Sequence, residues 1–337
     1  MYPRLSDLFN DLLGVDLALP LYSFGLMVAL ALLTAAWMTR KELDRMYRIG
    51  LVGAVRVSGK DEKGRTRTTA QSPSALVWTL MLLAGGFGIL GAKLFHVVDY
   101  WDEFVQDPAG MVFSTSGLTF YGGLVVATIA VAVYAYRKGV RVPRLADAAA
   151  PGLLLGYGIG RVGCYLAGDG DWGVCSSLAD KPSWIPGFLW SETFPRNVVG
   201  PGRTAVDPVA FNAQVRGAEC ALAAPDGVYP TMLYEFAMAA ALAGVLWLLR
   251  KHPFKAGWLF SLYAVFAGAE RFLIEEIRVN PEAAFGLPQS QIISVLFVVA
   301  GLVGLAVTTR RGPALGGPAP GSGGERAAPL REEVADA

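Results

Sequence analysis

The chain of 337 residues has little charge, little histidine and little cysteine. Only 17% of its residues are charged, against roughly 25% in ordinary soluble domains, and 53% are hydrophobic. Two histidines and three cysteines exclude a histidine-rich metal site and a disulfide-rich scaffold. The 29 basic and 28 acidic residues nearly cancel, so the overall charge gives no reason to expect nucleic-acid binding. This composition argues against a soluble enzyme and indicates an integral membrane protein.

Long apolar stretches are what the sequence has instead. Seven of them approach the roughly 20 residues that cross a bilayer as a helix: 21–39, 75–97, 118–136, 148–166, 230–249, 257–276 and 291–309. The first has no basic segment before it and no small-residue cleavage site after it, so we interpret it as a retained span rather than a cleaved signal peptide. We therefore expect an all-α membrane protein of about seven transmembrane helices.

The charges between these stretches alternate in sign. Basic residues gather at 40–67, 137–144, 250–255 and 310–311, whereas 98–117 carries four acidic residues and no basic one. Because basic loops stay on the cytoplasmic side, this pattern predicts an external N-terminus and an internal C-terminus.

The same pattern divides the chain into three parts. Residues 1–20 form an external N-terminal segment, and 21–311 form the membrane domain. Within that domain, 167–229 is an external loop long enough to be a small ordered cap. The Gly- and Pro-rich segment 312–337 has too little apolar surface to fold and predicts a disordered cytoplasmic tail.

Charged residues inside the spans point to a functional site, because burying them in a bilayer is costly. The fourth stretch contains Arg161, and the sixth contains Glu270, Arg271 and Glu275, with Arg278 just beyond it. At 3.6 residues per turn, Arg271, Glu275 and Arg278 share one helix face. The alternative, an internal Arg271–Glu275 salt bridge that only offsets burial, leaves Arg161 without a purpose.

The predicted topology brings these polar features to one side of the membrane. Spans four and six run outward, so Arg161 and Arg271 fall in their outer thirds. Other spans run inward and place 121–123 and 234–235 near the same surface. Guanidinium groups offer a fixed fork of donors to phosphate oxygens. We therefore predict a phospholipid headgroup site in the outer leaflet.

Four motifs, in this order, make most of residues 20–310 resemble the bacterial prolipoprotein diacylglyceryl transferases. They are TFYGGL (119–124), GRVGCYLAGD (160–169), YPTMLYE (229–235) and ERFLIEEIR (270–278). The resemblance implies transfer of the diacylglyceryl group of phosphatidylglycerol to the lipobox cysteine of a preprolipoprotein, which forms a thioether and releases glycerol phosphate. It also implies a multi-pass protein of the bacterial cytoplasmic (inner) membrane whose active site faces the outer leaflet. The expected partners are phosphatidylglycerol, the signal peptide and membrane lipids, with no metal, cofactor or nucleic acid.

The resemblance also implies residue roles. Arg161 would clamp the lipid phosphate, and Arg271 would stabilise the leaving phosphate. Glu275 would orient Arg271, and Arg278 would bind or gate the headgroup. Further positions match substrate-binding segments of the family: Tyr234, Glu235, Gly122, Gly123 and Cys164. Asp169 matches an acidic residue that follows the signature segment.

The proton acceptor stays open, because Tyr121 stands where well-known family members have histidine. A tyrosine with a pKa of about 10 is a poor base at neutral pH. Either Glu275 or Asp169 takes the thiol proton, with Tyr121 as a further catalytic candidate, or nearby arginines lower the pKa of the substrate thiol and make a strong base unnecessary.

The cysteines leave alternatives as well. Cys164, which replaces an asparagine of the family, is either an enzyme nucleophile or a small packing residue. Cys175 and Cys220 lie in the external loop and form either a disulfide or two free thiols. The rival reading of the whole chain is a non-catalytic membrane protein of the same fold that binds phospholipid or signal peptide.

Overall fold

The computed structural model describes residues 2–14, 21–60, 66–114, 119–200, 204–217, 219–280 and 282–309. The predicted tail at 312–337 lies outside these residues. Seven long helices coincide with the seven apolar stretches: α2 (Ser23–Arg48), α3 (Val77–Asp99), α6 (Phe120–Arg137), α7 (Val142–Ala167), α9 (Thr231–Leu249), α10 (Trp258–Glu275) and α11 (Gln289–Thr308).

Four of these helices are long and apolar enough to cross a membrane. They are α2, α9, α11 and α3, the last together with the preceding 3-10 turn η1 (Pro73–Leu76). Helix α6 is apolar but shorter. The protein is therefore mostly helical, as expected for an all-α, multi-pass membrane protein.

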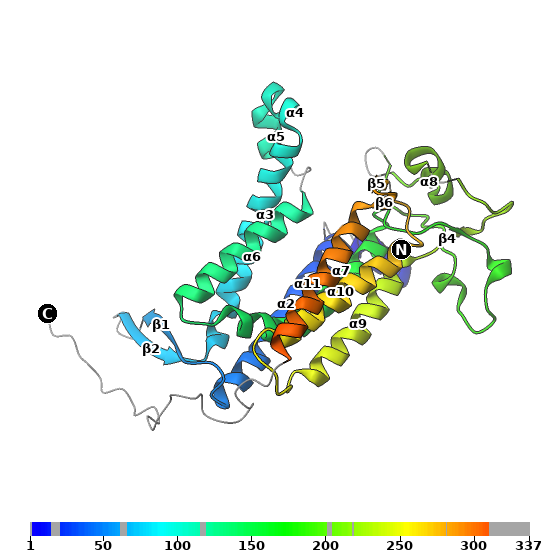
Figure 1. Cartoon of the computed structure of the whole chain (residues 1–337). Helices are drawn as coiled ribbons and strands as arrows, with labels where there is room; N and C mark the ends of the chain where they lie inside the picture. The colour runs from blue at the N-terminus through cyan, green and yellow to red at the C-terminus, as the bar shows by residue number, and fades with distance from the viewer. Residues whose placement is uncertain are drawn as a thin grey trace.

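Five helices form the main bundle. Helix α7 packs against α2, α9 and α10, and α11 lies along α10 (Figure 1). Small residues and leucines of α7, α9 and α10 fill the centre, and all are buried: Ala150, Leu154, Ala239, Ala243, Leu246 and Leu259. Burying these apolar faces fixes the helices that carry the charged residues.

Helices α3 and α6 pair with each other and diverge from the bundle, and we call this pair the arm (Figure 1). Glycines allow the pair to pack closely: a Cβ on Gly122 would lie 2.4 Å from Phe95, and one on Gly91 would lie 2.6 Å from the carbonyl oxygen of Gly122. The short helices α4 (Trp101–Gln106) and α5 (Pro108–Phe113) cover one end of the arm.

At its other end the arm joins the bundle through a continuous apolar core. This core combines Leu43 of α2, Leu80 of α3, Ala135 of α6 and Leu145 of α7. Next to it, β1 (Val55–Lys60) and β2 (Thr66–Gln71) form an antiparallel hairpin, with Val55 opposite Gln71. We call this the hairpin end of the bundle.

The chain between α7 and α9 folds over the opposite end of the bundle, and we call it the cap (Figure 1). Its regular elements are short: β3 (Cys175–Ser176), η2 (Leu178–Asp180), η3 (Gly187–Leu189), α8 (Pro208–Arg216) and β4 (Gly227–Val228). Trp172 and Phe194 form its buried centre, and the Trp172 indole donates a hydrogen bond to Asn212 (3.0 Å). A disulfide joins Cys175 to Cys220, so of the two alternatives the chain adopts the disulfide.

Two smaller features complete the cap end. Helix α1 (Leu5–Leu13) packs beside the cap, where Arg196 is ion-paired with Asp11 (2.7 Å). Strands β5 (Glu282–Ala284) and β6 (Leu287–Pro288) form a small hairpin between α10 and α11.

Candidate functional site

Three arginines and three carboxylates meet at the cap end of the bundle, and we call them the arginine cluster: Arg161, Arg271, Arg278, Asp171, Glu235 and Glu275. Arg161 of α7 binds two of the carboxylates. Its Nη1 lies 2.6 Å from Oδ2 of Asp171, and its Nη2 donates to Oε1 of Glu235 (3.0 Å). The second pair connects positions 74 residues apart in the sequence.

Arg278 binds the same two carboxylates from the other side. Its Nη2 lies 2.6 Å from Oδ1 of Asp171, and its Nη1 lies 2.9 Å from Oε1 of Glu235. Glu235 is fully buried on α9, and its Oε2 also accepts a hydrogen bond from the Tyr157 hydroxyl (2.6 Å). Glu235 is therefore the centre of the cluster.

Arg271 is the most exposed arginine of the cluster. Its guanidinium lies 3.1 Å from Oε2 of Glu275 and 3.5 Å from Oε1 of Glu235, and 29% of its side chain is exposed. Glu275 also accepts a hydrogen bond from Asn280. Helix α10 ends at Glu275, and the turn after it still brings Arg278 into the cluster, in line with the predicted shared face.

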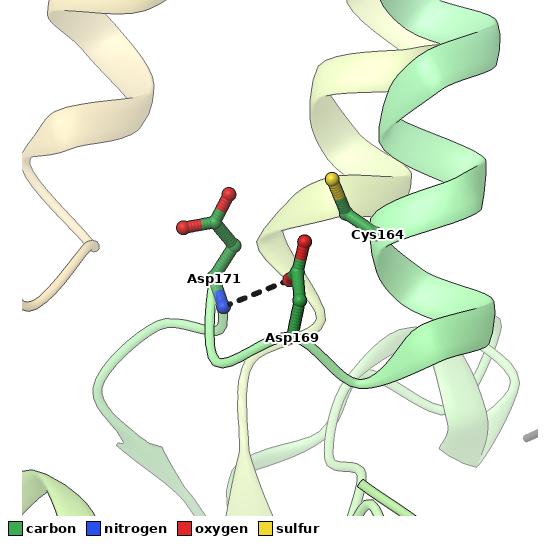
Figure 2. Close-up of side chains that lie close together, drawn as sticks. All are labelled: Cys164, Asp169 and Asp171. Atoms are coloured by element: carbon green, nitrogen blue, oxygen red, sulfur yellow. Dashed lines mark hydrogen bonds between the residues drawn. The ribbon is translucent and has the colours of Figure 1, made fainter. Parts of the chain in front are cut away.

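Asp169, Asp171 and Cys164 lie together at the end of α7 (Figure 2). The backbone N–H of Asp171 donates to the Asp169 carboxylate (3.3 Å). Metal-binding atoms of the three residues lie within 4.8 Å of one another. However, Arg161 and Arg278 already contact both oxygens of Asp171 at 2.6 Å, and their positive charges oppose a metal ion at this position.

The two aspartates of this group titrate in opposite directions. Burial raises the pKa of Asp171, but the charges of Arg278 and Arg161 outweigh burial and lower that pKa to about 2. The pKa of Asp169 is raised, because its carboxyl is partly desolvated, although the residue as a whole is exposed, and because it lies beside Asp171. Asp171 is thus a permanent anion, whereas Asp169 can exchange a proton more easily.

Some of the other predicted site residues lie near the cluster, and others pack against neighbouring elements. Tyr121 of α6 lies within electrostatic range of Arg271 and Glu275. Gly122 and Gly123 instead press against α3. The hydroxyl of Tyr234 donates to the backbone carbonyl of Leu189 in the cap (2.5 Å). The buried Cys164 has its sulfur 3.5 Å from Nη1 of Arg161.

Two residues of the site were missed by the sequence analysis. Asp171 is the second aspartate of GDGDWG, and the pair of acidic residues beside a glycine-rich helix end was an available signal. Tyr157, which binds Glu235, lies four residues before Arg161 and therefore on the same helix face.

The cluster can bind an anion by exchanging hydrogen bonds. Three guanidinium groups face three carboxylates, and each arginine contacts more than one of them. A phosphate that enters beside the half-exposed Arg271 can replace part of its carboxylate contacts. Arginine suits this exchange because its planar fork fits carboxylate and phosphate oxygens alike.

Comparison with known proteins shows the family of this chain. Residues 12–307, most of the chain, match the family model described as prolipoprotein diacylglyceryl transferase. The chain belongs to the prolipoprotein diacylglyceryl transferase family.

Members of the family are similar to this chain over most of its length. A protein of Dehalococcoides mccartyi, named phosphatidylglycerol–prolipoprotein diacylglyceryl transferase, is 32% identical over 66% of the chain and 73% of its own length. Proteins with the same name from Bacillus cereus and Bacillus cytotoxicus are 26% and 25% identical over 88% of the chain and 90% of their own lengths.

Proposed function

We infer that this family member is a transferase that moves the diacylglyceryl group of phosphatidylglycerol to the cysteine thiol of a prolipoprotein during lipoprotein maturation. A C–S bond forms to the glyceryl carbon, the C–O bond to phosphate breaks, and the thiol proton leaves. The observation that carries this conclusion is the arginine cluster, which can hold the lipid phosphate before and after the bond breaks.

The inference extends to the placement of the protein in the membrane. Seven helices span the bacterial inner membrane, with the N-terminus outside, the C-terminus inside and the arginine cluster towards the outer leaflet. The basic residues at 40–48 and 250–255, which belong to the hairpin end, support this orientation through the positive-inside rule. The cap is then external, where an oxidising compartment supports its disulfide.

Each arginine has a distinct role in this proposal. Arg161 and Arg278, held by Asp171 and Glu235, form the fixed floor of the phosphate site. Arg271 contacts the phosphate directly and stabilises the charge that develops on it as the C–O bond breaks. Glu275 orients Arg271 and is itself held by Asn280.

Asp169 is the better candidate for the acceptor of the thiol proton. Glu275 already binds Arg271 and Asn280, contacts that suit it to orient Arg271. Asp169 is exposed, makes no ion pair with any described residue and has a raised pKa. A base of this kind works best when its pKa approaches the operating pH. Tyr121 then serves as a hydroxyl donor to the lipid from the arm.

The test uses purified protein in detergent, phosphatidylglycerol and a lipobox peptide, followed by mass spectrometry. The peptide should gain one diacylglyceryl group on its cysteine, and a peptide with serine at that position should gain none. Asp169→Asn should slow turnover more than Glu275→Gln when lipid is saturating. Lipid binding without any thioether product, under conditions in which another family member works, would contradict the transferase.

A further inference from the structure

Glu270 is a buried carboxyl group that the proposed reaction does not use. It lies on α10 directly before Arg271 and is 3% exposed. Its Oε1 is shielded from solvent and accepts no hydrogen bond from any described residue. No ion pair reaches it within the described part of the chain, although three guanidinium groups lie nearby.

The surroundings of Glu270 are charged on most sides. Its charged and titratable neighbours are Tyr157 and Arg161 of α7, Glu235 of α9, Arg271 of α10 and Arg278 after it. Helix α11, which packs along α10, contributes no charged residue. Glu270 is therefore within electrostatic reach of the phosphate site without contacting its donors.

The charge of the cluster depends on this residue. The three arginines of the cluster balance its three carboxylates. The net charge of the cluster together with Glu270 is therefore zero when Glu270 is neutral and −1 when Glu270 is ionised. An isolated ionised carboxylate in an apolar interior is far more costly than a neutral acid. A second negative charge beside Glu235 also opposes the arrival of a phosphate anion.

We propose that Glu270 is a positioning residue that carries a proton in the working enzyme and thereby keeps the arginine cluster neutral, so that the cluster accepts the phosphate of the lipid. Glu270 does not touch the lipid. It acts through the net charge at the phosphate site. Ionisation of Glu270 at high pH weakens lipid binding, because the cluster then gains a negative charge. This inference rests on the proposed phosphate site.

The experiment compares the pH dependence of KM for phosphatidylglycerol in wild type and Glu270→Gln. In wild type, KM should rise on the alkaline side, by up to about tenfold per pH unit for a single proton. In Glu270→Gln, KM should stay flat over that range, because glutamine mimics the neutral acid. The matched control is Glu276→Gln directly after the same helix, an exposed residue bonded to Gln291 (2.7 Å), which should follow wild type.

A second variant and a spectroscopic measurement keep the test decisive if one variant misfolds. Glu270→Leu removes the carboxyl altogether and should also show a flat KM. The infrared spectrum of wild type at neutral pH should contain a protonated carboxylic acid band that Glu270→Gln lacks. The proposal would be overturned if KM rose by the same amount on the alkaline side in wild type, Glu270→Gln and Glu270→Leu. Loss of turnover in both Glu270 variants at an unchanged Tm would also overturn it.

The design separates this inference from the proposed function. If wild type forms no thioether product, the function itself fails, and the infrared band still reports whether Glu270 holds a proton. If wild type is active and the band is absent, only the role of Glu270 fails.

Discussion

Both ends of the bundle bury charged residues, but they use them differently. At the hairpin end, Glu42 is 1% exposed and binds Arg45 and Arg250. Asp147 of α7 is fully buried there and accepts hydrogen bonds from the backbone N–H groups of Gly257 (2.7 Å) and Phe260 (2.9 Å) at the start of α10. These carboxylates connect neighbouring elements, and Glu42 pairs with two arginines.

At the cap end, one carboxylate has more partners. Glu235 alone binds three arginines and Tyr157, and Arg271 remains partly exposed. A single carboxylate that binds several guanidinium groups neutralises the positive charge of each group only in part. The difference teaches that burial of charge alone does not mark a functional site. The cap end differs in that three arginines share one carboxylate and one of the three, Arg271, has 29% of its side chain exposed.

The largest expected effect is the loss of turnover when Arg271 is removed. Arg271→Ala should lower kcat by about 100- to 1,000-fold, the typical effect of removing one donor that stabilises transition-state charge. Arg271→Lys should recover only part of the rate, because an ammonium lacks the planar fork. The measurement is thioether formation at saturating lipid.

Arg250 at the hairpin end is the matched control for this substitution. Arg250→Ala removes a contact to the buried Glu42 and should lower Tm while the turnover of folded protein persists. If Arg250→Ala reduced kcat as strongly as Arg271→Ala, the proposed difference between the two ends would be wrong.

The second effect concerns stability at the hairpin end. Glu42→Gln leaves Arg45 and Arg250 without their common counter-ion and should lower the free energy of unfolding by about 3 kcal/mol. Unfolding in detergent, followed by circular dichroism against denaturant, measures this change. Glu103→Gln on the exposed helix α4 should leave stability within about 0.5 kcal/mol of wild type. Equal effects of the two variants would refute a structural role for Glu42.

The smallest effect is a pH dependence of stability from His252, a buried residue between α9 and α10. Burial, and then the charges of Arg144 and Arg45, lower its pKa from 6.5 to about 4. The unfolded chain binds the proton more tightly, so this stability is present at high pH and is lost as pH falls below 6.5 towards 4. Between about pH 7.5 and 5.5, we expect wild type to lose about 1 kcal/mol more than His252→Asn. An equal loss of unfolding free energy in wild type and His252→Asn between these two pH values would contradict this assignment.

The apolar stretches predicted the long helices well because burial in lipid and helix formation demand the same continuous run of residues. They predicted the ends less well. Helix α2 continues to Arg48, nine residues beyond the predicted span, because Leu43 and Met46 are buried in the apolar core that joins the arm to the bundle. The charge pattern predicts only a basic loop at 40–67, whereas the structure has the β1–β2 hairpin there. Its alternation of Val55 and Val57 with polar residues was a strand signal.

The residues of the site were predictable in type but not in pairing. Charges in apolar helices are rare enough to identify Arg161 and Arg271 from the sequence. That Glu235 binds Arg161, Arg271 and Arg278 depends on how three helices cross, which no local periodicity encodes. The position of Gly122 against α3 likewise depends on helix packing, and its predicted role in substrate binding stays a prediction.

The attachment of the arm at one end makes it a lever. Helix α3 has 23 residues and is therefore about 35 Å long. A rotation of about 5° at the hairpin end would displace the far end of such a rod by about 3 Å. Tyr121 lies in the first turn of α6 at that far end, within electrostatic range of Arg271, so it would move farther than residues near the hairpin end. Small repacking around Leu43 and Leu80 would thus shift Tyr121 relative to the arginine cluster.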